Sequence, residues 1–99
     1  ILINISRGSV VDEETVAGAL EGGRLAWFVA DVFEMEDWVL PGRPKVVLDR
    51  LLKQVEKTLF TPHIGSAVDR VRLEIAIQAA SAIGQYLEGK QPDQAVNKV

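Results

Sequence analysis

The chain has 99 residues, 47% of them hydrophobic, and a formal net charge of −3, which suits one soluble domain with a hydrophobic core. It has one histidine and no cysteine, so disulfides and thiolate chemistry are excluded and we predict no metal site. Without a basic cluster or a long apolar run, nucleic acid and membranes are not expected as partners, and a cytoplasmic location is expected.

The N-terminal third has the pattern of a βαβ unit. Residues 1–5 (ILINI) form an apolar run that is typical of a strand covered on both faces. Acidic residues at 12–14, an apolar stripe within 16–20 and the pair Gly22-Gly23 predict a helix with its start and its end. Residues 25–32 predict a second strand, parallel to the first, after a right-handed crossover.

The segment 33–57 is irregular and contains Pro41, Gly42 and Pro44. Such a long connection is often functional or mobile. Within it, residues 49–55 favour a short helix. A brief strand over 58–61 then leads to the Pro-His dipeptide at 62–63.

The last predicted element is a long helix. Ser66 is expected to cap it, with Asp69 three residues later, and one face stays apolar from Val68 to Tyr86. Gly89 and Pro92 end the pattern. Roughly 22 residues give a rod of about 33 Å, long enough to reach from one domain to another.

Arg7, Asp31 and His63 each follow one of the three strand-like runs. Ligands of parallel sheets bind beyond the carboxyl ends of the strands, so we expect these residues to meet at one sheet edge. Histidine suits acid-base chemistry near neutral pH. A lone histidine is more often a surface residue, and this shared edge is what favours a functional interpretation.

An acidic segment follows the second strand. Glu36 is the expected partner of the imidazole, because a neighbouring carboxylate favours imidazolium and fixes the tautomer. Glu34 and Asp37 are rivals for this position. In isolation, all three would form a solvated acidic loop.

Other charged residues have both a functional and a structural interpretation. The Arg7 guanidinium, flanked by small residues, matches a carboxylate or a phosphorus oxyanion, or is an exposed loop arginine. Arg72 adds positive charge to the same pocket, or pairs with Asp69 or Glu74. Asp31 accepts hydrogen bonds from a carboxamide, or caps a turn.

Three segments together resemble the C-terminal part of the D-isomer-specific 2-hydroxyacid dehydrogenase family. They are INISRGSVVDEETVAGALEGGRL, ADVFE and LFTPHIGSAVDRVR. The resemblance implies an α/β fold: the C-terminal part of a Rossmann-like parallel-sheet NAD-binding domain, and a long C-terminal helix that reaches back to a substrate domain. Residues 1–66 would be the C-terminal half of the nucleotide-binding domain, and 67–99 the helix and tail.

Because the chain starts within a strand and has no Gly-x-Gly-x-x-Gly or Walker-type loop, we interpret it as a fragment. The substrate domain and the dinucleotide fingerprint would lie upstream. We therefore expect the isolated chain to be inactive and a full-length parent to be a homodimer.

Within the family, DVFEMEDW and GRPKVVLD resemble the phosphonate (phosphite) dehydrogenase branch, which oxidises phosphite to phosphate with NAD. DRLLKQVEK departs from the stretch that the family has before its last strand, which we interpret as loop variation. The alternatives are a D-2-hydroxyacid dehydrogenase of the glyoxylate or hydroxypyruvate reductase type, and a non-enzymatic module like the corepressors that are similar to this family.

The resemblance implies roles by position. Arg7, Glu36 and His63 match the catalytic residues, and Arg7 and Arg72 match substrate-binding residues. The cofactor-binding positions would be Ile5, Ser6, Arg7, Asp31, His63, Gly65 and Ser66. The substrate would be a small anion, phosphite or a 2-hydroxy acid, and the cofactor NAD. The choice between NAD and NADP stays open at this point.

Overall fold

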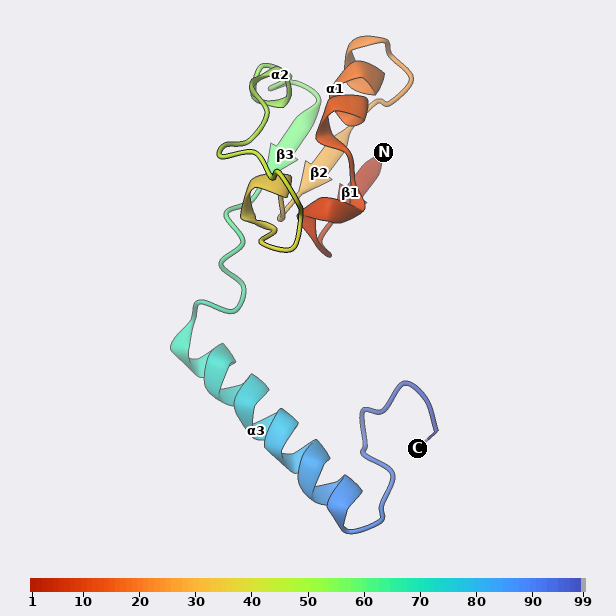
Figure 1. Cartoon of the computed structure of the whole chain (residues 1–99), viewed down its shortest axis with the longest axis vertical. Helices are drawn as coiled ribbons and strands as arrows, with labels where there is room; N and C mark the ends of the chain where they lie inside the picture. The colour runs from red at the N-terminus through yellow and green to blue at the C-terminus, as the bar shows by residue number, and fades with distance from the viewer. Residues whose placement is uncertain (99) are drawn as a thin grey trace. The chain divides into compact units, whose positions relative to one another are not determined.

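The computed structural model describes residues 1–98 and divides into two compact units, Ile1–His63 and Ile64–Val99. The first unit holds a parallel sheet of three strands in the order β1-β2-β3 (Figure 1). The strands are β1 (Leu2–Asn4), β2 (Phe28–Ala30) and β3 (Thr58–Phe60). Each has only three residues, so β2 is shorter than the strand predicted over 25–32. The predicted α/β class and the parallel pairing are confirmed.

Helix α1 (Glu13–Glu21) connects β1 to β2, as the sequence predicts. Its first turn is capped by Asp12, whose side chain accepts a hydrogen bond from the Thr15 amide at 2.6 Å. At the other end Gly23 has a φ of 71°, a left-handed conformation that glycine adopts without steric cost. The acidic start and the glycine stop therefore set both ends of this helix.

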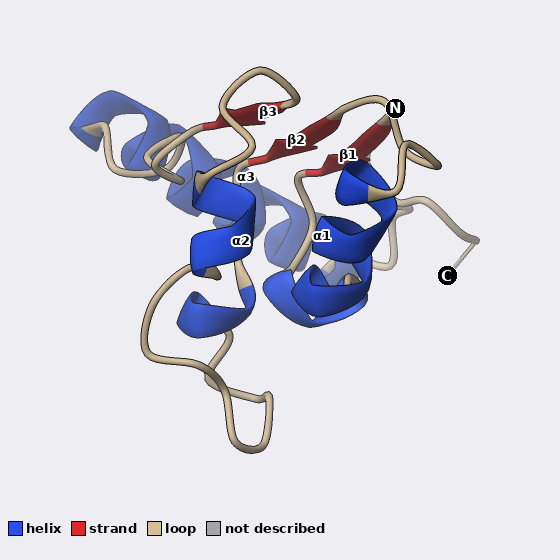
Figure 2. Ribbon diagram, turned by 90° about the horizontal axis from the view of Figure 1, so that it is seen from above, coloured by secondary structure: helices blue, strands red, loops and turns tan. Residues whose placement is uncertain are grey.

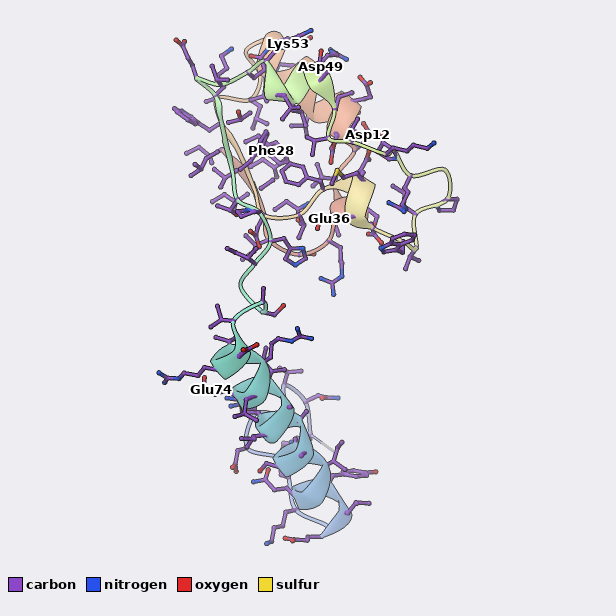
Figure 3. All side chains as sticks on the ribbon, turned by 90° about the vertical axis from the view of Figure 1, so that its left-hand side faces the viewer. Asp12, Phe28, Glu36, Asp49, Lys53 and Glu74 are labelled. Carbon is purple, nitrogen blue, oxygen red and sulfur yellow. The ribbon has the colours of Figure 1, made fainter. Side chains whose placement is uncertain are left out.

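One face of the sheet is covered by α1 and the short helix α2 (Asp49–Leu52), as seen from above in Figure 2. Between these helices and the sheet lies a core of buried apolar side chains: Val16, Ala17, Leu20, Phe28, Ala30, Phe33 and Leu51. Phe28 points from β2 into this layer (Figure 3). Phe60 packs edge-on against Phe28 and Phe33, with ring centroids 5.9 and 5.0 Å apart. The core thus fixes the ends of β2 and β3.

The opposite face differs from the prediction that the first strand is covered on both sides. Ile3 is 61% exposed and Leu59 is 57% exposed, although both are large apolar residues. Because side chains alternate along a strand, Leu2 and Asn4 face the helices while Ile3 faces away. The apolar run predicted the strand correctly, but the covering of its second face is not seen in the structure.

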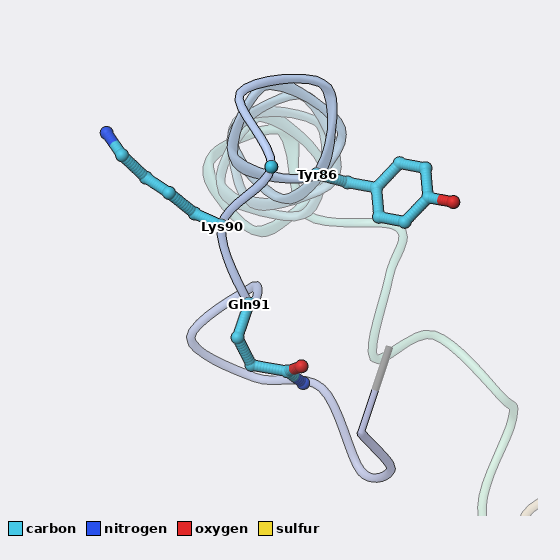
Figure 4. Close-up of a pocket in the computed structure, with 4 residues that line it drawn as sticks. Tyr86, Lys90 and Gln91 are labelled. Atoms are coloured by element: carbon cyan, nitrogen blue, oxygen red, sulfur yellow. The ribbon is translucent and has the colours of Figure 1, made fainter.

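The second unit consists of helix α3 (Asp69–Leu87) and the tail after it. Gly89, with a φ of 74°, ends the helix, as predicted, in a Schellman arrangement: its amide bonds the Tyr86 carbonyl, and the Lys90 amide bonds the Gln85 carbonyl. Figure 4 shows Tyr86, Lys90 and Gln91 around a pocket at this end of the helix. In residues 1–98 no helix is long and apolar enough to cross a membrane.

The predicted cap of α3 is wrong. Val68 occupies the cap position in an extended conformation, and no side chain caps the helix. Ser66 lies instead in a turn that the Ala67 amide closes by bonding the Ile64 carbonyl at 3.0 Å. This turn holds Ser66 before the helix starts, so its spacing to Asp69 does not form a capping box.

Candidate functional site

The three strands end in register, with Asn4, Ala30 and Phe60 as paired last residues. The chain segments that follow them therefore emerge at the same edge of the sheet. Asp31 comes directly after β2, and the turn of Arg7 and the segment of His63 follow β1 and β3. The predicted convergence of these segments at one edge is present in the first unit.

The centre of the site is a contact between the side chains of Glu36 and His63. Glu36 ends the 3-10 helix η2 (Glu34–Glu36), and its Oε2 lies 2.9 Å from Nδ1 of His63. Its other oxygen accepts a hydrogen bond from the Phe33 amide at 2.8 Å, which orients the carboxylate. Because a carboxylate only accepts hydrogen bonds, the proton of this contact lies on Nδ1. In neutral His63, Nε2 then carries the lone pair that can take a proton.

Asp31 holds the backbone of the His63 segment. Its Oδ1 accepts hydrogen bonds from the Thr61 hydroxyl and from the His63 amide, the latter at 3.1 Å. His63 has a φ of 52°, an uncommon conformation for a residue with a side chain. The Thr61 hydroxyl above all, and also the His63 amide, lower the pKa of Asp31 below its ordinary value of 3.8. Through these hydrogen bonds, Asp31 holds the segment that follows β3 next to the end of β2.

The Asp31 contacts predict an acid sensitivity of folding. A carboxyl group with a lowered folded-state pKa stabilises the fold above its ordinary value, and that contribution is lost as the pH falls through the lowered one. Asp31→Asn is therefore expected to reduce stability at pH 7 and to flatten the loss of stability below about pH 4. Urea unfolding midpoints between pH 2 and pH 7 measure this change.

Thr61→Val is the matched variant for this test, because it keeps the carboxylate and removes its main donor. Thr61→Val should also make the loss of stability below about pH 4 less steep, as Asp31→Asn does. A Thr61→Val chain with the acid sensitivity of the wild type would contradict the assignment of the lowered pKa to this hydrogen bond.

Arg7 lies in a turn that a buried asparagine organises. The Asn4 side chain is 4% exposed, donates to the Arg7 carbonyl at 2.9 Å and accepts from the Ser6 amide at 3.2 Å. The Arg7 guanidinium bonds the Ser6 carbonyl at 2.8 Å and is exposed. Sequence reasoning missed Asn4, although a single amide inside the apolar run ILINI was a usable signal, since buried polar groups are normally hydrogen-bonded.

The two rivals of Glu36 are held by other contacts. The Glu34 amide bonds the buried Glu13 carboxylate at 2.7 Å, and burial, with nearby carboxylates, raises the pKa of Glu34. Asp37 is buried and accepts hydrogen bonds from Ser9. Of the three acids, the structure brings only Glu36 to the imidazole.

The remaining predicted residues are divided between the units. Ile5 and Ser6 are exposed beyond β1, beside Arg7. Gly65, Ser66 and Arg72 lie in the second unit, where Ser66 and Arg72 line a common pocket of about 390 Å³. Of the two acids considered as partners of Arg72, Asp69 and Glu74, the second pairs with Arg70 at 2.9 Å. Within residues 1–98 there is no cluster of three side chains suited to bind a metal ion.

Comparisons with known proteins identify the family of this chain. The family model described as "D-isomer specific 2-hydroxyacid dehydrogenase, NAD binding domain" matches residues 1–65. Glyoxylate reductase of Aeropyrum pernix is 34% identical over 98 residues, which are 99% of this chain and 27% of that protein.

Two crystal structures are similar to the chain. One, of a protein from Pyrococcus horikoshii OT3, has a TM-score of 0.75 and 33% identity, covering 98% of this chain and 27% of the other. The second is a D-isomer specific 2-hydroxyacid dehydrogenase from Xanthobacter autotrophicus Py2 in complex with NADPH and MES. It has a TM-score of 0.55 and 33% identity, covering 96% of this chain and 35% of the other.

The chain spans only 14% to 27% of the length of the curated relatives that it matches. The family model nevertheless matches about two thirds of the chain and includes the strand ends, the turn of Arg7, Glu36 and His63. The chain therefore belongs to the D-isomer specific 2-hydroxyacid dehydrogenase family, through the NAD binding domain of that family.

Proposed function

We propose that these residues form part of an NAD-dependent dehydrogenase that interconverts a small 2-hydroxy acid and the corresponding 2-oxo acid. The observation that carries the proposal is the contact between Glu36 and His63 at the carboxyl edge of the sheet. It supplies a base of fixed tautomer at the place where ligands of parallel sheets bind. The family match and the resemblance to a glyoxylate reductase support the substrate class.

The exposed residues at this edge fit a nicotinamide cofactor. Ile5 offers an apolar surface, being 76% exposed just beyond β1, and Asp31 offers carboxylate oxygens that can accept from a carboxamide. When bound, NAD accepts the hydride. NADP is an alternative cofactor, because a related structure holds NADPH.

Residues of this chain would carry out proton transfer and substrate binding. In the oxidation direction, Nε2 of His63 takes the hydroxyl proton as the hydride leaves the adjacent carbon, and Glu36 stabilises the imidazolium that forms. Arg7 holds the substrate carboxylate with its planar guanidinium. In the reverse direction, the same imidazolium returns its proton to the carbonyl oxygen.

A second candidate substrate is phosphite. It is favoured by the segments DVFEMEDW and GRPKVVLD, which resemble the phosphite branch of the family. Arg7 would hold the phosphorus oxyanion with its guanidinium. His63 would deprotonate the attacking water as hydride leaves phosphorus.

The proposed function is tested by turnover of the full-length protein, since relatives are several times longer than this chain. Formation of NADH is measured with phosphite and with a panel of 2-hydroxy acids, and NADPH formation in parallel. Saturable turnover of a 2-hydroxy acid is the expected result. Turnover of phosphite alone would select the second candidate, and partner binding without any turnover would favour a corepressor-like module.

A further inference from the structure

The turns that carry Arg7 and Glu36 contact each other directly. Arg7 precedes the 3-10 helix η1 (Gly8–Val10), and Glu36 ends η2. A Cβ atom added to Gly8 would lie 2.0 Å from the Phe33 carbonyl oxygen and 2.5 Å from the Glu34 nitrogen. The two backbones are thus in contact, with no space for a side chain between them.

Asp37 fastens these two turns together. Its Oδ2 accepts from the Ser9 amide at 3.1 Å and from the Ser9 hydroxyl at 2.5 Å, and its Oδ1 accepts from the Val39 amide at 3.2 Å. Asp37 is only 8% exposed. The Ser9 hydrogen bonds, first that of the hydroxyl, lower the pKa of Asp37, and the nearby Arg7 charge acts in the same direction. The acceptor is therefore an ionised carboxylate at neutral pH.

This contact joins residues adjacent to the proposed catalytic groups. Asp37 is covalently next to Glu36, and Ser9 is two residues beyond Arg7. A shift of Asp37 would move the Cα of Glu36 relative to the imidazole, with which Glu36 makes a contact of 2.9 Å. Small displacements of this kind are costly where hydrogen-bond geometry positions reacting groups.

We propose that the Ser9–Asp37 hydrogen bonds form a clamp that sets the position of Glu36 against His63, and that Asp37 is a positioning residue of this site. The proposal rests on the proposed function for its catalytic meaning. The alternative is a clamp that contributes to stability alone, which would leave the Glu36–His63 contact unchanged when it is removed.

Hydrogen bonds to Glu13 hold η2 in a second way, so the Ser9–Asp37 hydrogen bonds can be removed while η2 stays folded. The Glu13 carboxylate, 3% exposed, accepts from the Glu34 amide at 2.7 Å and from the Leu48 amide at 3.5 Å. These bonds hold the start of η2 independently of Ser9. Ser9→Ala should therefore loosen the end of η2 that bears Glu36 without releasing its start.

The test uses nitrogen NMR of the 99-residue chain at alkaline pH, where imidazoles are neutral. His63 is the single histidine, so its ring signals report the Nδ1–H and Nε2–H tautomers without ambiguity. The wild type should favour Nδ1–H. Ser9→Ala should lower the ratio of Nδ1–H to Nε2–H about fivefold, the scale of one net hydrogen bond.

Two variants serve as controls. Ser9→Thr keeps the hydroxyl and should retain most of the wild-type tautomer ratio. Ser81→Ala removes an exposed hydroxyl in the second unit and should leave the ratio unchanged. Asp37→Asn, of nearly the same shape as the wild type, should lower the ratio as Ser9→Ala does, and it replaces Ser9→Ala if amide spectra show that Ser9→Ala is unfolded.

A folded Ser9→Ala or Asp37→Asn chain with the wild-type tautomer ratio would overturn the clamp. A wild-type chain without preference for Nδ1–H would overturn it as well. The proposed function is tested independently, by measuring turnover of the full-length protein. If turnover is absent but the tautomer ratios shift as expected, the dehydrogenase proposal is refuted and the clamp is supported.

Discussion

Gly8→Ala is expected to destabilise the first unit by about 3 kcal/mol or to prevent its folding. The added methyl group would meet backbone atoms of Phe33 and Glu34, which, unlike the end of a flexible side chain, cannot turn away. Relief requires the turns η1 and η2 to separate. That separation would stretch the Ser9–Asp37 hydrogen bonds at the same time. Urea unfolding of the 99-residue chain at neutral pH measures the loss.

Gly84→Ala provides the matched control. Gly84 lies within α3, where an added Cβ meets nothing within 4 Å. Alanine in a helix interior is favoured over glycine by about 1 kcal/mol, so this variant should keep or increase the stability of α3. If Gly8→Ala were tolerated as well as Gly84→Ala, the close approach of the two turns would be contradicted.

His63→Ala is expected to lower kcat/KM of the full-length protein about 100- to 10,000-fold, the range of general acid-base contributions. The imidazole is the only one in the chain, and Glu36 contacts its Nδ1, which leaves Nε2 for the proposed role as the base. Steady-state rates measure the loss, with whichever 2-hydroxy acid or phosphite the full-length protein turns over.

The conformation of His63 requires a control for backbone effects. Its φ of 52° is a conformation that asparagine tolerates better than most residues do. His63→Asn should therefore fold like the wild type and lose as much activity as His63→Ala. Near-normal turnover of either variant would show that His63 is not the base.

The order of elements could be predicted because local signals agreed. Asp12 and the glycine pair gave both ends of α1, and the apolar runs gave the three strands in parallel order. Ser66 shows the limit of such signals. Its spacing to Asp69 suits a capping box, but the turn closed by Ile64 and Ala67 keeps it outside the helix.

The sheet edge and the pairing of Glu36 with His63 were predictable from the sequence, whereas the contacts of Glu34 and Asp37 were not. From the sequence, Glu36 was the expected partner of the imidazole, while Glu34 and Asp37 stayed as rivals because they are acidic residues of the same segment. The structure separates them by their contacts: the Glu36 carboxylate contacts His63, the Asp37 carboxylate accepts from Ser9, and the Glu34 backbone amide donates to Glu13. These contacts join residues 21 to 28 positions apart, which no local pattern encodes.

The central claim is that Glu36 and His63 act as one unit, and a double-mutant cycle on kcat/KM tests it most directly. Glu36→Gln is compared in the wild-type background and in the His63→Ala background of the full-length protein. A pair that acts as a unit is non-additive, so Glu36→Gln should lower kcat/KM about tenfold in the first background and less than about twofold in the second. An equal loss in both backgrounds would show that the two residues act independently.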